Sequence, residues 1–317
     1  MKKIKNTTNL ISVITLILIF TMLAFGCAPA SAGGDETTEP AQTTAPSSIT
    51  EDETTELPPP PQDFSVMTYN IAGYFGTSQD HKNAIVSAIS TNAPDVAVIN
   101  ETTDALCKEN AALSDVYGYI FPTVGDKKTD YMVLYKKDKF TALSDESYYL
   151  SPTPDVYSKV SGSYHYRTMT AVKLEHIQSG RQFYFIATHL ENNSSNADVF
   201  QQRNNARKLQ VKFMLNLINE KLDSSLPIII AGDLNSSDRT DDKYRKGGIS
   251  DILASGKFEN CSSVAKNTSA EFTHVSGISL DHIIVSKGHF TVSQFRVDKS
   301  ETPPSDHHPV IATVELK

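Results

Sequence analysis

The chain has 317 residues, a length that allows one large domain or two small ones. Its 29 basic and 37 acidic residues are spread unevenly, because three Lys precede residue 27 and eight acids lie in residues 27–63. Residues 64–317 therefore hold 26 basic and 29 acidic side chains, a net charge of −3. This balance argues against a strongly basic groove for long nucleic acid, although a local patch beside a metal site can suffice for DNA.

Residues 1–26 are typical of a secretory signal peptide, with three early Lys and an uncharged apolar run from Leu10 to Gly26. The run ends at Cys27, and a small residue before a single Cys resembles a bacterial lipoprotein cleavage site. Leu23 lies four residues before this Cys, where the usual pattern has Leu three before it. We expect an exported protein held on the membrane by a lipid at Cys27. Cleavage after Ala32, giving a secreted protein, and an uncleaved anchor are the alternatives.

Residues 27–63 are rich in Thr, Pro, Glu, Ser and Ala and end in a run of four Pro at 58–61. They offer almost nothing apolar to bury, so the composition predicts a disordered linker between the envelope and the folded part.

Residues 64–317 show no second linker and no internal repeat, which predicts one domain. Two cysteines, Cys107 and Cys261, remain there; two are too few for a disulfide scaffold, and half-buried free thiols are favoured over a pair. The apolar pattern predicts strands at 64–71, 96–99, 131–135, 168–174, 183–188, 228–231, 280–285, 290–297 and 310–316, with helices at 80–92 and 196–222. This is an α/β or α+β chain with a sheet-on-sheet core flanked by helices.

Polar side chains occur where these strands begin or end. Burying a carboxylate beside an apolar strand costs free energy unless the carboxylate is paired or binds a metal. One such residue is ordinary turn chemistry, but a set of five is not. The five are Asn70, Glu101, Asp233, Asp281 and Asp306, and His189, Asn235 and His307 stand beside them.

If these strand ends converge, they form an oxygen-rich site with imidazoles and no cysteine. Such ligands suit Mg²⁺, Mn²⁺ or Ca²⁺ rather than zinc. A hard divalent cation among carboxylates and histidines suits phosphoryl chemistry, in which a base activates water and an acid protonates the leaving group.

Six segments resemble, in order, the motifs of the endonuclease/exonuclease/phosphatase superfamily, which includes pancreatic-type deoxyribonuclease, abasic-site endonucleases, neutral sphingomyelinases and inositol-polyphosphate 5-phosphatases. The segments are Met67–Ile71, Asn100–Glu101, Ala187–Glu191, Ala231–Asn235, Leu280–Ile283 and Ser305–Val310. The resemblance covers nearly all of residues 64–317 and implies a four-layered α/β sandwich of two packed, mostly antiparallel sheets flanked by helices. Asn100 stands where the family often has Gln. Ala72 stands where abasic-site endonucleases often have Asp, which argues against that branch.

The resemblance also implies a role for each motif residue. Glu101 would be the main metal ligand, with Asn70 beside it and Asp306 near the metal, and the metal would be Mg²⁺ or Mn²⁺, with Ca²⁺ as a further option. Asp233 would orient or deprotonate the attacking water. The phosphate and the leaving oxygen would be contacted by the remaining residues, which are His189, Asn235, His307 with Asp281 behind it, and Arg167.

The expected function is hydrolysis of a phosphodiester or phosphomonoester outside the cell, with a nuclease acting on DNA or another nucleic acid as the leading option. A sphingomyelinase-like enzyme and a small organophosphate phosphatase are alternatives, since one fold hosts all three. A tethered domain that binds without catalysis is an alternative of another class. We expect a monomer.

Two loops and several histidines lie outside these motifs. The loops 143–166 and 236–250 are expected to set specificity, and their tyrosines either line a groove or are half-buried strand residues. His165, His176, His274 and His289 have no partner pattern and are assigned to the surface or the core. His282 and His308 adjoin motif positions and are assigned a structural role.

Overall fold

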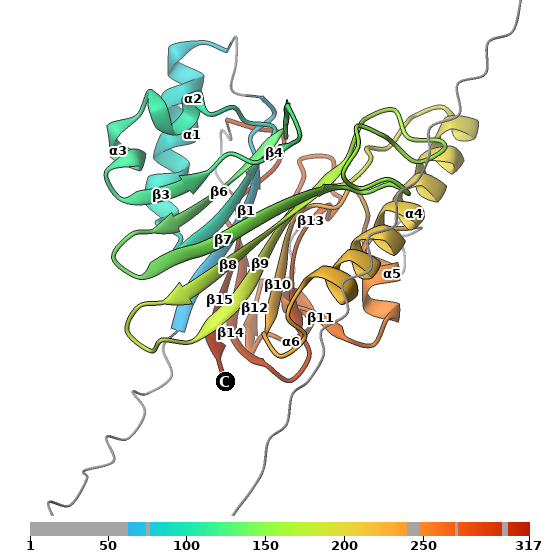
Figure 1. Cartoon of the computed structure of the whole chain (residues 1–317). Coiled ribbons are helices and arrows are strands. Elements are labelled where there is room, and N and C mark those ends of the chain that lie inside the picture. Colours follow the sequence, from blue (N-terminus) through green and yellow to red (C-terminus); the bar gives the residue numbers. More distant parts are fainter. Residues whose placement is uncertain (1–62, 74–76, 240–246, 270–271, 300–303) are drawn as a thin grey trace, which may run out of the picture. The chain divides into compact units, whose positions relative to one another are not determined.

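The computed structural model describes residues 63–73, 77–239, 247–269, 272–299 and 304–317 (Figure 1). The predicted signal peptide, the linker and Cys27 lie outside the described residues, as does part of the predicted 236–250 loop. Among the described helices, none is both long enough and apolar enough to cross a membrane.

Two large sheets form the centre of the described domain. The first has seven strands in the order β12-β14-β15-β1-β2-β6-β3, and the second has six in the order β11-β13-β10-β9-β8-β7. The first sheet contains β1 Asp63–Asn70, β2 Val96–Asn100, β3 Tyr117–Ile120, β6 Tyr131–Lys136, β12 Asn267–Thr268, β14 Phe290–Val297 and β15 Val310–Leu316. The second contains β7 Phe140–Tyr149, β8 Thr168–His176, β9 Gln182–His189, β10 Ile228–Asp233, β11 Phe258–Asn260 and β13 Asp281–Ser286. A small hairpin pairs β4 Thr123–Val124 with β5 Lys127–Lys128.

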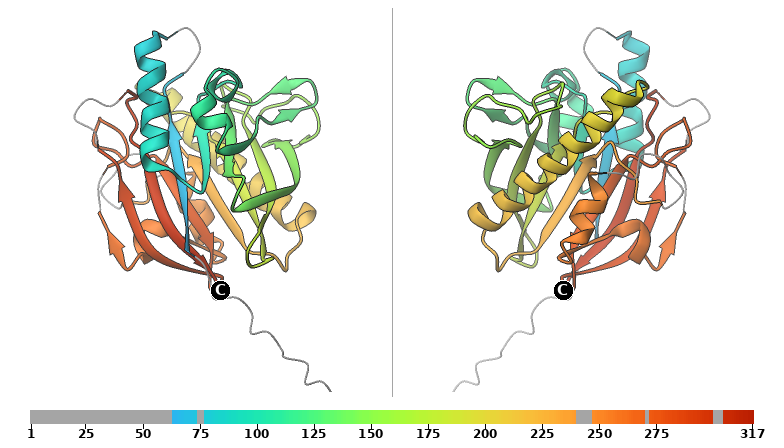
Figure 2. Two further views of the ribbon diagram at one scale, coloured as in Figure 1. Left: turned by 90° about the vertical axis from the view of Figure 1, so that its left-hand side faces the viewer. Right: turned by 90° about the vertical axis from the view of Figure 1, so that its right-hand side faces the viewer.

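Helices cover the outer face of each sheet (Figure 2). These helices are α1 Gln79–Asn92, α2 Ala105–Lys108, α3 Ala111–Ser114, α4 Ala197–Lys221 and α5 Ile249–Ala254. The short α6 Cys261–Val264 instead places Cys261 between the sheets. One apolar cluster joins α1, α2 and α3 to the first sheet, and another joins α4 and α5 to the second sheet. A third cluster fills the space between the sheets. The molecule therefore has the four layers that the resemblance implied.

Strand periodicity explains how one strand serves two cores, because successive side chains point to opposite faces. In β10, Ile229 and Ala231 enter the cluster between the sheets, whereas Ile228 and Ile230 enter the cluster under α4. A strand buried on both faces has no polar side to mark it, which is why these strands are short apolar runs in the sequence.

The predicted strands and the two predicted helices are all present, with ends that differ by one or two residues. The described pairings are mostly antiparallel; the parallel ones join β1 to β2, β9 to β10 and β12 to β14. The prediction of a loop over 143–166 was wrong for residues 143–149, which belong to β7. That strand is at the edge of its sheet and mostly exposed from Thr141 to Ser147, so its sequence lacks an apolar alternation.

The two cysteines are both buried and unpaired. Cys107 lies in the cluster under α1 and Cys261 in the cluster between the sheets. The free-thiol alternative is therefore confirmed.

Candidate active site

The topology brings the polar strand ends to one edge of the two sheets. Because β1 and β2 run parallel, their last residues Asn70 and Asn100 are partners in register. In the second sheet, Asp233 at the end of β10 is in register with His189 at the end of parallel β9. It is also in register with Asp281, the first residue of antiparallel β13. The convergence that the sequence analysis had to assume is thus a direct result of strand direction.

Asparagine amides join the two sheets at this edge. Asn100 Nδ2 donates to the carbonyl of Thr188 at 3.0 Å, and Asn100 Oδ1 accepts from the amide of Asp233 at 3.2 Å. Asn70 Nδ2 donates to Asp233 Oδ2, also at 3.0 Å. These bonds are buried, so they fix the spacing between the motifs of the first sheet and those of the second.

The Asp233 carboxylate is the centre of the cluster and is only 2% exposed. Besides Asn70, its Oδ2 has His189 Nε2 at 3.5 Å and His307 Nε2 at 3.9 Å. Its Oδ1 accepts from the backbone amide of Asn235 at 2.8 Å. A buried carboxylate of this kind, surrounded by donors, can accept a proton from a water molecule placed beside it.

The turn after β10 is shaped by two unusual backbone conformations. A Cβ on Gly232, whose φ is +151°, would lie 2.0 Å from the carbonyl oxygen of Thr188, so no other residue fits there. Asn235 has a left-handed φ of 49°, and its side-chain nitrogen donates to the carbonyl of Leu190 at 3.1 Å. This turn aims both Asp233 and Asn235 toward the same edge, and left-handed non-glycine residues of this kind are concentrated at functional sites.

His307 is held by Asp281. Its Nδ1 lies 2.8 Å from Asp281 Oδ2, which also accepts a hydrogen bond from Thr273 Oγ1 at 2.8 Å. Burial lowers the pKa of His307, but the carboxylates of Asp281 and then Asp233 outweigh it and raise that pKa to about 10. The imidazole is therefore protonated at neutral pH, and its Nε2 is a proton donor directed at the Asp233 side of the site.

His189 is oriented by a residue that the sequence analysis did not select. Its Nδ1 lies 2.8 Å from Oδ2 of Asp130, which precedes β6. Arg167 NH1 donates to the same oxygen at 3.0 Å. Loss of solvent around its carboxylate raises the pKa of Asp130, although the side chain is 47% exposed, but His189 and then Arg167 outweigh this effect and hold that pKa well below its usual range. Arg167, predicted to contact phosphate, is 5% exposed and is engaged here in positioning Asp130.

Of the three predicted metal ligands, the structure places Asn70 and Glu101 in contact, with Asn70 Nδ2 donating to Glu101 Oε1 at 3.0 Å. Glu101 is exposed at the end of β2 and has a left-handed φ of 55°. Asp306 is half-exposed, and its Oδ2 lies 3.4 Å from Nε2 of His274, whose ring packs edge-on against His307. His274 had been assigned to the surface or the core.

The oxygen atoms at this edge suit a hard divalent cation, because most of them belong to carboxylates. In addition, Oδ1 of buried Asp281 has no hydrogen-bond partner among the described residues. Of the predicted ligands, Asp306 also lies in a compact group with His274 and His307, and Asp233, Asp281 and His307 form a second such group; in each the ligand atoms lie within 4.8 Å of one another. Because His307 is protonated, it donates a proton in these groups and leaves the carboxylates as the cation's possible ligands.

A buried network behind the site also escaped the sequence analysis. Glu191 is fully buried and accepts from the backbone amide of His165 at 3.0 Å, from Ser163 Oγ and from Arg203. Arg207, on α4, is fully buried and donates to the Glu191 carbonyl at 2.8 Å. Burial lowers the pKa of Arg207 to about 10. The available signal was the position of two arginines, Arg203 and Arg207, one helical turn apart on α4.

The structural assignments of two other histidines agree with their contacts. His282 Nε2 bonds to the carbonyl of Ser236 at 2.7 Å, and His308 is 7% exposed.

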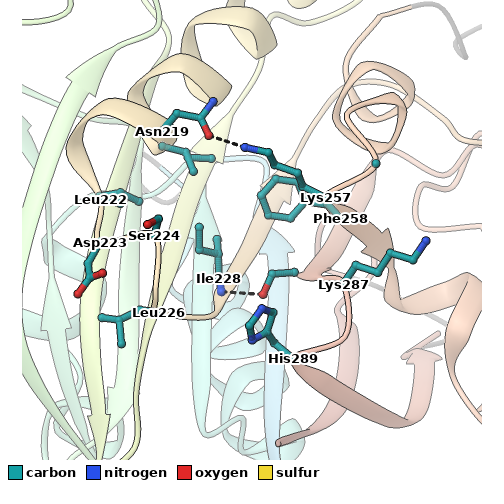
Figure 3. Close-up of a pocket in the computed structure, with 13 residues that line it drawn as sticks. Asn219, Leu222, Asp223, Ser224, Leu226, Ile228, Lys257, Phe258, Lys287 and His289 are labelled. Carbon is teal, nitrogen blue, oxygen red and sulfur yellow. Dashed lines mark hydrogen bonds between the residues drawn. The ribbon is translucent and has the colours of Figure 1, made fainter.

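A separate hollow of about 480 Å³ lies at the opposite ends of β10 and β13 (Figure 3). Ile228, which begins β10, and Ser286, which ends β13, line it together with Lys257, Lys287 and His289. Among its described lining residues Asp223 is the single carboxylate, so this hollow lacks the acidic cluster of the other edge.

The fold occurs in solved structures of low sequence identity. An endonuclease/exonuclease/phosphatase family protein from Bacteroides thetaiotaomicron superposes with a TM-score of 0.68 at 20% identity, covering 81% of this chain and 99% of that one. A mannosyl-6-phosphatase from Bacteroides thetaiotaomicron gives 0.63 at 20% identity, covering 79% and 99%. D. rerio TDP2 complexed with single strand DNA product gives 0.58 at 16% identity, covering 80% and 98%. No curated protein sequence matches the chain.

The family model described as "Endonuclease/Exonuclease/phosphatase family" matches residues 67–307. The chain belongs to this family, whose members are hydrolases of phosphate esters, and the matched segment contains every residue of the cluster described above.

Proposed function

We propose that this protein is a divalent-cation-dependent phosphoesterase that hydrolyses phosphodiester bonds in nucleic acid outside the cell. The observation that carries the proposal is the buried Asp233 carboxylate, to which one amide and two imidazoles are directed. Family membership supports hydrolysis of a phosphate ester. The nucleic-acid complex of D. rerio TDP2, which shares the fold, is consistent with a nuclease-like substrate.

In the proposed reaction, Asp233 removes a proton from a water molecule, and the water oxygen bonds to the phosphorus. The bond from phosphorus to the ester oxygen breaks, and His307 gives its Nε2 proton to the leaving oxygen. Asp281 stabilises the positive charge of the imidazole before transfer and fixes the ring through Nδ1. His189 and Asn235 bind the phosphate oxygens, and Asp130 holds the His189 ring in place.

Glu101 and Asn70, with Asp306, are the residues that would hold the cation. The cation would neutralise charge on the phosphate oxygens. The acidic character of the edge gives a reason for needing it, because a phosphodiester anion approaching Asp233, Asp281 and Glu101 would otherwise be repelled.

The test is a hydrolysis assay of the purified protein on plasmid DNA, bis-p-nitrophenyl phosphate and sphingomyelin, each with Mg²⁺, Mn²⁺, Ca²⁺ or EDTA. We expect cation-dependent cleavage of plasmid DNA and of bis-p-nitrophenyl phosphate, and its loss in Asp233→Asn. Cleavage of sphingomyelin alone would assign a phospholipase branch. A folded protein that binds the cation and cleaves none of the three would contradict the proposal.

We also propose that the enzyme is a lipoprotein of the cell surface, on the basis of the residues before Cys27. Labelling expressing cells with a tritiated fatty acid should mark the wild type and not Cys27→Ser. Release of unlabelled wild-type protein into the medium would instead support cleavage after Ala32.

A further inference from the structure

A hollow of about 520 Å³ opens directly beside the catalytic edge. Asp130, the residue that orients His189, is part of its lining, as is Thr168 at the start of β8. A group bound in this hollow is therefore one side chain away from the phosphate position proposed above.

Stacked aromatic rings form one wall of the hollow. The rings of Tyr157 and Tyr166 lie 3.7 Å apart at an angle of 17°, and the ring of Tyr149 packs edge-on against Tyr157 at 5.5 Å. Tyr157 is 50% exposed and Tyr166 39% exposed, whereas Tyr149 is buried beneath them. Exposed rings that are already stacked in parallel form a platform for a further flat ring, because a nucleobase gains dispersion and hydrophobic contact there whatever its sequence.

Positive side chains flank this platform. Lys127 Nζ lies 5.8 Å from the centre of the Tyr157 ring, and Lys159 Nζ lies 5.4 Å from the centre of the Tyr166 ring. Lys127 is half-exposed on the β4–β5 hairpin, and its partner Asp126 is 84% exposed, so solvent screens that ion pair. Its long stem allows the ammonium to leave the ring and follow a phosphate.

The segment that carries the platform is anchored from beneath. Buried Glu191 binds Ser163 and the amide of His165. Gly162 has φ +82° and packs so closely on α4 that a Cβ there would lie 2.8 Å from the carbonyl oxygen of Gln202. Leu150 donates to the carbonyl of Arg167 at 2.8 Å, which closes the segment at its base. A platform fixed in this way binds a ring without first being ordered.

We propose that this hollow binds a base of single-stranded nucleic acid next to the scissile phosphate, with Tyr157 and Tyr166 as the stacking platform and Lys127 as the ligand of a neighbouring phosphate. The inference rests on the proposed function, since it supplies the nucleotide that flanks the cleaved bond. We expect a single strand to be preferred to a duplex, because a base in a duplex is already stacked on both faces and must first be unstacked. The near-neutral domain is compatible with this substrate, because a short contact needs a local patch rather than a long basic groove.

The decisive experiment compares two substrates and two proteins. The substrates are a single-stranded oligonucleotide and an oligomer of the same length built from abasic tetrahydrofuran units; the proteins are the wild type and Tyr157→Ala/Tyr166→Ala. We expect the double variant to lose about 5- to 100-fold in kcat/KM on the oligonucleotide, mostly through KM, and to match the wild type on the abasic oligomer. Equal losses on both substrates would overturn the proposal, because the rings would then act on something other than the base.

Matched variants separate stacking from charge. Tyr157→Phe keeps the ring and should retain wild-type KM. Lys127→Ala should raise KM for the oligonucleotide and reduce its dependence on salt. Lys287→Ala, which alters another exposed lysine in the hollow of Figure 3, should change neither. A loss in Lys287→Ala equal to that in Lys127→Ala would contradict a local phosphate contact.

A binding measurement keeps this inference distinct from the proposed function. In EDTA, a fluorescein-labelled oligonucleotide should show higher anisotropy with the wild type than with the double variant at the same concentration. If binding differs in this way and no phosphate ester is cleaved with any cation, the proposed function fails while the base site stands. If phosphodiesters are cleaved and the two proteins bind equally, the base site fails alone. Displacement of the oligonucleotide by a hexose phosphate as effectively as by a nucleotide would assign the hollow to sugars and overturn the base site.

Discussion

Asp130 offers a test of the site that does not alter any residue proposed to touch the scissile phosphate or the cation. Its carboxylate is hydrogen-bonded to His189 Nδ1 at 2.8 Å and accepts a hydrogen bond from Arg167 NH1 at 3.0 Å. Replacing it by Asn keeps the size and one acceptor oxygen but removes the charge. The amide can also present nitrogen to His189, which would turn the ring or exchange its tautomer.

The magnitude follows from the bonds that are lost. A hydrogen bond to a charged group contributes about 1.5–3 kcal/mol, and Asp130 makes one with a histidine and one with an arginine. Because the Asp130 side chain is 47% exposed, water replaces part of this interaction, and the lower end of the range applies. We expect kcat to fall about 10- to 100-fold with little change in KM. Losses of this size follow when the partner that orients a metal-binding histidine is removed, and Asp130 orients His189 in the same way.

The assay is steady-state kinetics on bis-p-nitrophenyl phosphate with saturating Mg²⁺. Asp126→Asn, in the nearby β4–β5 hairpin, is the matched control and should behave as wild type, since Asp126 is 84% exposed. If Asp130→Asn retained full kcat while remaining folded, His189 would not need this partner, and the role assigned to Asp130 would be wrong.

Three further predictions concern the fold and the cation. Gly232→Ala should lower the free energy of unfolding, measured by urea denaturation, by about 3 kcal/mol or more, because the new Cβ meets a backbone oxygen at 2.0 Å. Gly180→Ala, at a residue with φ +65° and open space around it, is the control and should lower the free energy of unfolding by about 1–2 kcal/mol. Burial raises the pKa of Asp95, but the Ser65 amide, Lys136 and Lys139 outweigh this effect and lower the pKa overall. The ionised carboxylate therefore stabilises the fold above about pH 4, and this stabilisation is lost as the pH falls through the lowered pKa. Asp95→Asn should therefore cost about 3 kcal/mol at pH 7, and the difference from wild type should shrink toward pH 3; a constant difference would show that the charge is not responsible. Glu101→Gln should raise the Mg²⁺ concentration for half-maximal activity about 10-fold or more, and an unchanged titration would remove Glu101 from the ligand set.

Sequence reasoning reached most of the strands and helices because strand and helix periodicity is local, and the resemblance to the family implied the four layers. It missed β7 because residues 141–147 lie on an exposed edge, where no core imposes an apolar alternation. Candidate site residues such as Asp233 and His307 were selected because they follow or precede apolar strands in an ordered set of motifs.

The sequence by itself determined which strands are apolar, where each ends, and which polar residues stand at those ends, since all of these depend on neighbours along the chain. Only the tertiary structure decided that Asp130 supports His189, that Glu191 and Arg207 lie buried behind the site, and that the tyrosines of the 150–167 segment stack beside it. These contacts join residues far apart in the chain through side chains with no periodic pattern. Their partners are set by strand direction and by the packing of one sheet on the other, which becomes defined only when the layers are assembled.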